Sequence, residues 1–312
     1  MQLIQKTTNI DFIGRRKLAM FFSVALIIAS IVSLAVQRLN LGIDFTGGTL
    51  IEVEFKQSIE PSDVRNVLTE AKFTDVLVQH FGTSHDLLIR LAPHESLSSA
   101  EISTQVLGIL ERAYPDQVEL RRVEFVGPQI GDELTEQGGL AMLYALIGIL
   151  VYVSLRFEKR FAAGSVIALA HDVIITIGFF SITRTEFDLS VLAAVLAVIG
   201  YSLNDTIVVF DRIRENFRRM RKGTPVEVMN ISINQTLSRT IMTSFTTLLV
   251  LIALFFFGGE IIHGFAIALI VGIVIGTYSS IYVASTLALV LGASKADLMP
   301  VKKEGAETDG RP

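Results

Sequence analysis

Six long apolar stretches constrain this chain more than any other feature of its sequence. A helix needs about 20 residues to cross roughly 30 Å of hydrocarbon. The stretches span residues 18–36, 138–155, 161–183, 189–210, 240–257 and 264–291. A mean hydropathy of +0.54 over 312 residues, 51% of them hydrophobic, is also typical of a membrane protein. The sequence therefore predicts an α-helical polytopic membrane protein with six transmembrane helices. We interpret the first stretch as an uncleaved anchor, because five more follow it.

Basic residues mark one side of the predicted membrane. They cluster before the first stretch, between the second and third, after the fourth at residues 212–222, and after the sixth. The positive-inside rule then places both termini in the cytoplasm and the long first loop on the opposite, exported side of the membrane. The expected divisions are a cytoplasmic N-terminus at 1–17, the first span at 18–36, a periplasmic domain at 37–137, spans two to six at 138–293 with a basic cytoplasmic loop at 211–236, and a disordered cytoplasmic tail at 294–312.

The long first loop carries a regular order of patterns. Residues 49–55, TLIEVEF, alternate apolar and polar side chains, as half-buried strands do. Proline opens a helical pattern at 61–73. Two strand patterns at 75–81 and 86–91 flank a GTSH turn, and a second helix and a last strand follow at 96–115 and 117–126. The order βαββαβ predicts a small α+β ferredoxin-like domain.

Asp205 is an ionisable residue in the predicted membrane part, and its exposure to lipid would cost free energy. It lies six residues inside the apolar stretch, about 9 Å by helical rise, too deep for a short side chain to reach water through lipid. A carboxyl buried at that depth indicates a functional role rather than simple packing. Asn204 precedes it, and Arg239, at the mouth of the fifth span, lies at a similar depth and has a long side chain.

His171 and Asp172 interrupt the third span about 16 Å from its basic end. Two interpretations stay open. They are either a satisfied polar pair that packs against another helix, or part of a proton relay with Asn204 or Thr206 as neighbours. We expect no metal there, because no further ligands accompany the pair.

Several classes of function are disfavoured. The chain has no cysteine, hence no thiol nucleophile or disulfide, and it lacks a P-loop pattern. The sequence GYSLND before Asp205 differs from the glycine-x-glycine-aspartate of intramembrane aspartyl proteases. The basic run at 212–222 is interpreted as a positive-inside determinant with a solvated face, and contact with acidic lipid or a ribosome-like partner is the alternative. We expect no nucleic-acid partner. We expect no enzyme activity and no cofactor.

Three motifs resemble one known family. LGIDFTGGTLIEVEF at 41–55 resembles the strand-opening signature of the bacterial SecD/SecF protein-export family. VGPQIGDEL at 126–134 is similar to the junction that precedes the second span in that family, and GYSLNDTIVVFDRIRE at 200–215 with SRT at 238–240 resembles its SecF branch. The resemblance runs in order from about residue 10 to 292, with the same six-span layout.

The resemblance implies a function. Members of this family pair with SecD to form a twelve-span body of the RND superfamily and use the proton motive force in late steps of protein translocation through SecYEG. Expected partners are thus SecD, the SecYEG translocon, YajC and YidC, an unfolded exported polypeptide, and protons. The family's proton-coupling aspartate and arginine correspond to Asp205 and Arg239, with Asn204 beside them.

The glycines of the junctions are expected to join the exported domain to the membrane helices. Gly47 and Gly48 would let the chain turn from the first span into the sheet. Gly127, Pro128 and Gly131 would form a stiff joint, or hinge, to the second span. Two other functions stay open at this point: an RND-type exporter of lipids or small solutes, and a passive scaffold of the translocon.

Overall fold

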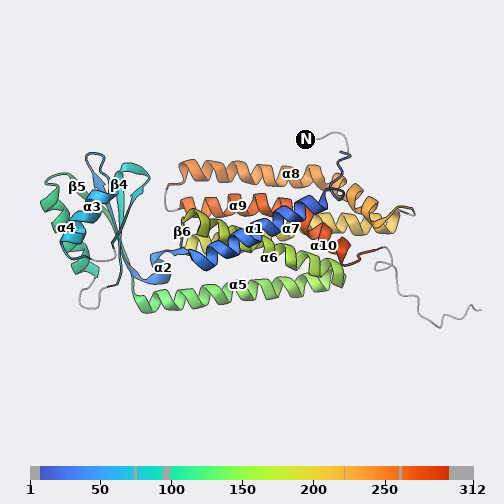
Figure 1. The fold of residues 1–312 in the computed structure, drawn as a ribbon, viewed down its shortest axis with the longest axis horizontal. Coiled ribbons are helices and arrows are strands. Elements are labelled where there is room, and N and C mark those ends of the chain that lie inside the picture. Colours follow the sequence, from blue (N-terminus) through green and yellow to red (C-terminus); the bar gives the residue numbers. More distant parts are fainter. Residues whose placement is uncertain (1–7, 74–75, 94–98, 221, 260–261, 295–312) are drawn as a thin grey trace, which may run out of the picture.

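The computed structural model has a long helical body with a small sheet domain at one end (Figure 1). It describes residues 8–73, 76–93, 99–220, 222–259 and 262–294. The expected cytoplasmic tail therefore lies almost wholly outside the described residues, as do the first seven residues of the N-terminal segment.

The helical body contains all six expected spans, and each is long and apolar enough to cross a membrane. The first five are α1 (Arg16–Val36), α5 (Pro128–Arg156), α6 (Lys159–Thr183), α7 (Leu189–Arg219) and α8 (Pro225–Phe257). The sixth is built from α9 (His263–Ser279), one π-helical turn (Ser280–Ala284) and α10 (Ser285–Val290). The predicted fold class, a six-span helical membrane protein with a small sheet domain, is confirmed.

Polar turns extend α7 and α8 beyond their apolar stretches. Thr224 accepts a hydrogen bond from Glu227 N while the Glu227 carboxylate accepts one from Thr224 N, which makes a capping box with Pro225 in the first turn. This cap starts α8 well before residue 240, and α7 runs on to Arg219. Most of the segment 211–236 is therefore helical.

The six spans do not contribute equally to the core. About half of the apolar window of α6, α7 and the sixth span is buried, against 6% for α5 and 17% for α1 and α8. Figure 1 shows α5 and α8 on opposite outer edges of the body. Polar side chains shielded from lipid should therefore come mainly from α6, α7 and α9.

The sheet domain has the predicted βαββαβ order. Its elements are β2 (Gly48–Phe55), α3 (Pro61–Glu70), β3 (Val76–Phe81), β4 (Thr83–Leu91), α4 (Ser99–Ala113) and β5 (Val118–Val126). The strands lie in the order β3-β4-β2-β5, with every neighbouring pair antiparallel. Phe55, Leu68 and Leu110 join the strands to both helices in one buried core.

One local prediction about this domain is wrong. GTSH was expected to form the whole turn between β3 and β4, but β4 already begins at Thr83. Gly82 has a φ of +80°, which glycine adopts without strain, so a tighter turn suffices. Phe81 then pairs directly with Thr83.

A short connecting region lies between the two parts. After α1, β1 (Asn40–Leu41) pairs in parallel with β6 (Glu186–Phe187), which links α6 to α7. The helical turn α2 (Ile43–Thr46) follows, so the DFTGG segment is helical before it turns. This region brings the entry to the sheet domain beside the start of α7.

Candidate functional site

Asp205 faces the interior of the helical body. It lies on α7 and is 2% exposed, and Thr206 beside it is also buried. Asn204 instead points to the surface of the chain, as does Arg239 on α8. The rotation of about 100° per residue along a helix separates Asn204 from its neighbour. Of the three residues expected to couple protons, only Asp205 therefore has its side chain buried in the helical body.

The carboxyl of Asp205 is poorly satisfied. The charge of Arg239 and the hydroxyl of Ser244 both act on it from α8. Its Oδ2 atom, however, is buried and has no hydrogen-bond partner among the described residues. Buried polar atoms normally have partners, and an ionised one without any is costly. Such a carboxyl is suited to taking up and releasing a proton.

Hydroxyl groups continue from this carboxyl toward α9. Ser244 Oγ and Thr277 Oγ1 lie 2.7 Å apart, which joins α8 to α9. Thr206 Oγ1 and Thr240 Oγ1 are buried without hydrogen-bond partners among the described residues. The environment of Asp205 is therefore polar but incompletely bonded within this chain.

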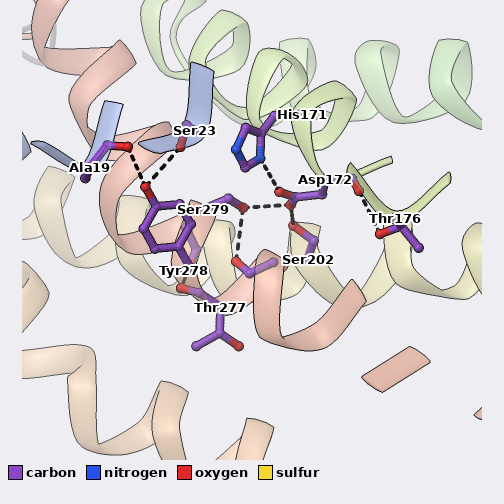
Figure 2. A network of polar contacts seen from close by, with 11 residues as sticks. Ala19, Ser23, His171, Asp172, Thr176, Ser202, Thr277, Tyr278 and Ser279 are labelled. Carbon is purple, nitrogen blue, oxygen red and sulfur yellow. Dashed lines mark hydrogen bonds and ion pairs between the residues drawn. The ribbon is translucent and has the colours of Figure 1, made fainter. Parts of the chain in front are cut away.

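Asp172 lies in the opposite situation, because both of its carboxyl oxygens are occupied (Figure 2). Its Oδ1 lies 2.8 Å from His171 Nδ1. Its Oδ2 accepts hydrogen bonds from Ser202 on α7 at 2.5 Å and from Ser279 on α9 at 2.6 Å. The carboxyl is 0% exposed. Its hydrogen bonds join α6, α7 and α9. The sequence suggested Asn204 or Thr206 as neighbours of this pair, but Ser202 and Ser279 are the residues that bond to Asp172.

The first span is tied to the same network through Tyr278. Its ring stacks on His171 with centroids 6.4 Å apart. The Tyr278 hydroxyl donates to Ala19 O at 2.7 Å and lies 3.0 Å from Ser23 Oγ, both on α1 (Figure 2). His171 Nε2 is buried without a hydrogen-bond partner among the described residues. The geometry fits the packing interpretation of the pair, and it leaves one imidazole nitrogen free.

Sequence reasoning did not single out Ser202, Ser244, Thr277, Tyr278 and Ser279. Short hydroxyl side chains in apolar helices commonly bond to their own backbone. Only the packing of α6, α7, α8 and α9 reveals which of them face a carboxyl. The run TYSS at 277–280, three of whose residues take part in these contacts, was the available signal.

The joint to the sheet domain is tightly packed at two of the expected glycines. A Cβ atom on Gly131 would lie 2.8 Å from Gly47 N and 3.0 Å from Phe45 O. Gly47 has a φ of +68° and lies against Pro128. Thr135, one turn further along α5, donates to Gly131 O and Phe45 O. The start of α5 is therefore held directly against α2.

The other two glycines have different surroundings. Gly48 has a φ of +129°, and a side chain there would meet Leu91 O. Gly127 has open space around it and caps α5 just before Pro128. Both are compatible with the expected joint.

A second set of contacts connects the joint to α7. Asp44 Oδ2 accepts a hydrogen bond from Leu189 N at 3.0 Å, and Asp188 caps the same helix at Val191 N. Arg90 of β4 reaches Glu186, with 3.9 Å between Nη1 and Oε1. Burial raises the pKa of the Glu186 carboxyl, and Asp188 and Asp44 add to this, while Arg90 opposes it. The helix that carries Asp205 thus begins at the base of the sheet domain.

Among the described residues, no group of three or more His, Cys, Asp or Glu side chains could hold a metal ion. Among the described residues of the membrane-spanning helices, the buried carboxyls are those of Asp172, whose two oxygens are hydrogen-bonded, and Asp205, whose Oδ2 atom has no partner.

Comparisons with family models and with individual relatives point to the same family. Residues 105–294 match the family described as protein export membrane protein SecD/SecF, C-terminal, and residues 32–59 match the SecD/SecF GG motif. The chain is 56% identical to the protein translocase subunit SecF of Vibrio alginolyticus over 100% of this chain and 99% of that one. It is 47% identical to SecF of Escherichia coli O157:H7, over 95% of this chain and 93% of the relative.

Two solved structures share the fold. The crystal structure of SecDF, a translocon-associated membrane protein from Thermus thermophilus, superimposes with a TM-score of 0.83 at 38% identity. The structure of SecDF in a super-membrane-facing form gives a TM-score of 0.68. Each match covers 93% of this chain but only 39% of the SecDF chain. The protein described here thus corresponds to a minor part of those longer polypeptides.

Proposed function

The chain belongs to the SecD/SecF family of protein-export membrane proteins, and on that premise we propose that it is the SecF-type subunit of a proton-driven protein translocation device. Its relatives carry the name protein translocase subunit, which supports a role in protein translocation. The chain covers 39% of the solved SecDF polypeptides, so a separate SecD-type chain is proposed to supply the remainder.

One observation carries this proposal. Asp205 is buried with an unpartnered carboxyl oxygen, while Asn204 and Arg239 lie at the surface of the isolated chain. A surface arginine and asparagine on membrane helices would be costly against lipid, so they are expected to face protein or a water-filled path. We place the SecD-type partner against α7 and α8, where it would complete the site.

The proposed mechanism alternates Asp205 between its protonated and ionised forms. Moving one charge across the membrane is worth about 2.3 kcal/mol per 100 mV, enough to bias two arrangements of a membrane body. Arg239 can approach the ionised carboxylate and leave the protonated one. Asn204 orients water at the same surface. His171 and Asp172 hold the helices around this site in place.

Movement would reach the sheet domain through the base of α7. The contact between Asp44 and Leu189 links α7 to the turn that enters β2, and Gly47 and Gly131 hold α5 to the same turn. A shift of α7 is therefore transmitted to the domain through a short, closely packed path. We propose that this domain lies in the periplasm, where it would act on the emerging polypeptide.

The remaining assignments follow from the same proposal. The protein would lie in the bacterial inner membrane with both termini in the cytoplasm, because the basic residues gather at that end. SecYEG would be the channel it serves, with YajC and YidC as further associates. No enzymatic step is required of this subunit.

Proton uptake by the reconstituted complex tests the proposal. We expect vesicles that contain the chain with its SecD-type partner to take up protons when a pH gradient is imposed, as read by an enclosed pH dye. Asp205→Asn should abolish the uptake at equal protein content. A variant that conducts as well as wild type would contradict the assignment of Asp205.

A further inference from the structure

A second charged cluster lies at the opposite end of the body from the sheet domain. A cavity of about 360 Å³ opens where α5 ends and α7 leaves its apolar stretch. Its lining consists of charged residues alone: Arg156, Asp211, Arg214, Glu215, Arg218 and Arg219. None of them belongs to the proposed proton site.

The carboxylates of this cavity are already neutralised. Asp211 pairs with Arg156 at 2.7 Å and with Arg214 at 3.3 Å. Glu215 pairs with Arg219 at 3.0 Å. Four arginines against two carboxylates leave the lining with a net charge of +2. Arg218 is exposed and makes no ion pair within the part of the chain that the structure describes. The cavity is thus complementary to an anion.

Two of the arginines are fixed in place before any ligand arrives. Arg214 makes two contacts of 2.9 Å with the carboxylate of Glu158. Arg214 and Arg156 both lie over the ring of Phe157, each 5.2 Å from its centroid. A planar guanidinium presents its N–H groups in a fork that suits phosphate oxygens. Since Arg156 and Arg214 are engaged by carboxylates, they form a fixed wall, and the exposed Arg218 and Arg219 beside it are the groups available to a phosphate.

The surface next to the cavity is apolar. On α5, immediately before Arg156, Leu155 is 85% exposed, Tyr152 is 50% exposed and Val151 is 54% exposed. This helix is the least buried of the six spans. A ligand with a phosphate in the cavity would therefore have hydrocarbon-facing surface available for an attached chain.

We propose that this cavity binds the headgroup phosphate of an anionic phospholipid, with the acyl chains lying along the exposed face of α5. Basic pockets at the ends of membrane helices commonly bind acidic lipid headgroups. A free phosphate ion would use the same arginines, but it would gain nothing from Val151, Tyr152 and Leu155. The proposed ligand is thus a lipid, and a comparison with inorganic phosphate as a probe separates it from a free anion.

The test uses the full chain, purified with its SecD-type partner in detergent and stripped of lipid. Short-chain phosphatidylglycerol, phosphatidylcholine and inorganic phosphate serve as probes, and bound lipid is counted by native mass spectrometry. The cavity variant is Arg218→Gln/Arg219→Gln. The matched control is Arg15→Gln/Lys17→Gln, which removes the same charge from exposed positions at the same end of the body.

We expect wild type and the control variant to bind phosphatidylglycerol well above phosphatidylcholine. The cavity variant should bind it about 30-fold more weakly, the effect of two basic residues facing an anionic lipid. Arg218→Lys/Arg219→Lys should keep most of the binding, which separates loss of charge from misfolding. Equal binding by wild type and the cavity variant, or full displacement of the lipid by inorganic phosphate, would overturn the proposal.

Discussion

Ser202, one helical turn before Asp205 on α7, donates a hydrogen bond of 2.5 Å to Asp172 of α6 (Figure 2). Ser279 occupies the same carboxyl oxygen from α9. The two buried carboxyls therefore have different surroundings. Hydrogen bonds to Asp172 join three helices, while Asp205 keeps one carboxyl oxygen without a hydrogen-bond partner among the described residues.

Removing the hydroxyl of Ser202 should loosen this contact. A typical hydrogen bond contributes about 0.5–1.5 kcal/mol, so Ser202→Ala should lower the free energy of unfolding by roughly that amount. Thermal unfolding of the detergent-purified protein measures the change. Ser238→Ala is the control, because the Ser238 hydroxyl, on α8, is not among the groups that bond to Asp172. An unchanged melting temperature in Ser202→Ala would show that Asp172 does not depend on α7.

Asp205→Asn should not destabilise the isolated chain. The substitution replaces a buried, partly unpaired carboxyl by a neutral amide of the same shape, which removes the cost of a buried charge. We expect a melting temperature at or above that of wild type at pH 8, where an ordinary carboxyl is ionised. A clear loss of stability would mean that Asp205 has a structural partner.

Gly131→Ala should disrupt the joint between α5 and α2. The added methyl group would approach the backbone at Gly47 and Phe45 within 3.0 Å, and such overpacking costs about 1–3 kcal/mol. Gly139, on the same helix, has nothing within 4 Å of an added Cβ. Gly139→Ala should therefore stabilise the helix by up to about 1 kcal/mol. Melting curves of the two variants that coincide would contradict the close packing at Gly131.

The joint should also respond to pH through Glu186. Its pKa is raised in the folded protein, chiefly by burial, above the ordinary value of 4.5. The folded state then binds more protons than the unfolded one, so this contribution is fully present below about pH 4.5. It is lost as pH rises through the folded pKa.

Glu186→Gln should remove that dependence. We expect the variant to gain stability relative to wild type as pH rises from 4 to 8, because the amide has no charge to bury. Melting temperatures of both proteins across this range give the comparison. A wild-type advantage that grows with pH would indicate that the ion pair with Arg90 dominates instead.

Much of this architecture follows from local patterns. The six spans, the capping box of α8 and the βαββαβ order each depend on spacing within one segment. The depth of Asp205 in its stretch was enough to predict that its side chain is buried. Periodicity could not show that Asn204 faces outward, because both sides of α7 are apolar enough to be buried.

Contacts between segments far apart in the chain could not be predicted from the sequence. The pairing of β1 with β6 involves two residues from each strand, too few for an alternating pattern. Ser202 and Ser279 are ordinary helix residues until α6 presents Asp172 between them. Such pairs depend on helix rotation and packing, which composition and spacing do not determine.

The central claim is that Asp205 couples proton movement to protein export. The most direct test is gradient-driven completion of export into inverted membrane vesicles after ATP-driven initiation has been halted. Wild type and Asp205→Asn are compared at equal abundance and equal binding to the SecD-type partner. We predict that completion depends on the proton gradient in wild type and stops in the variant. Completion at the wild-type rate in Asp205→Asn would contradict the account and leave Asp205 a packing residue.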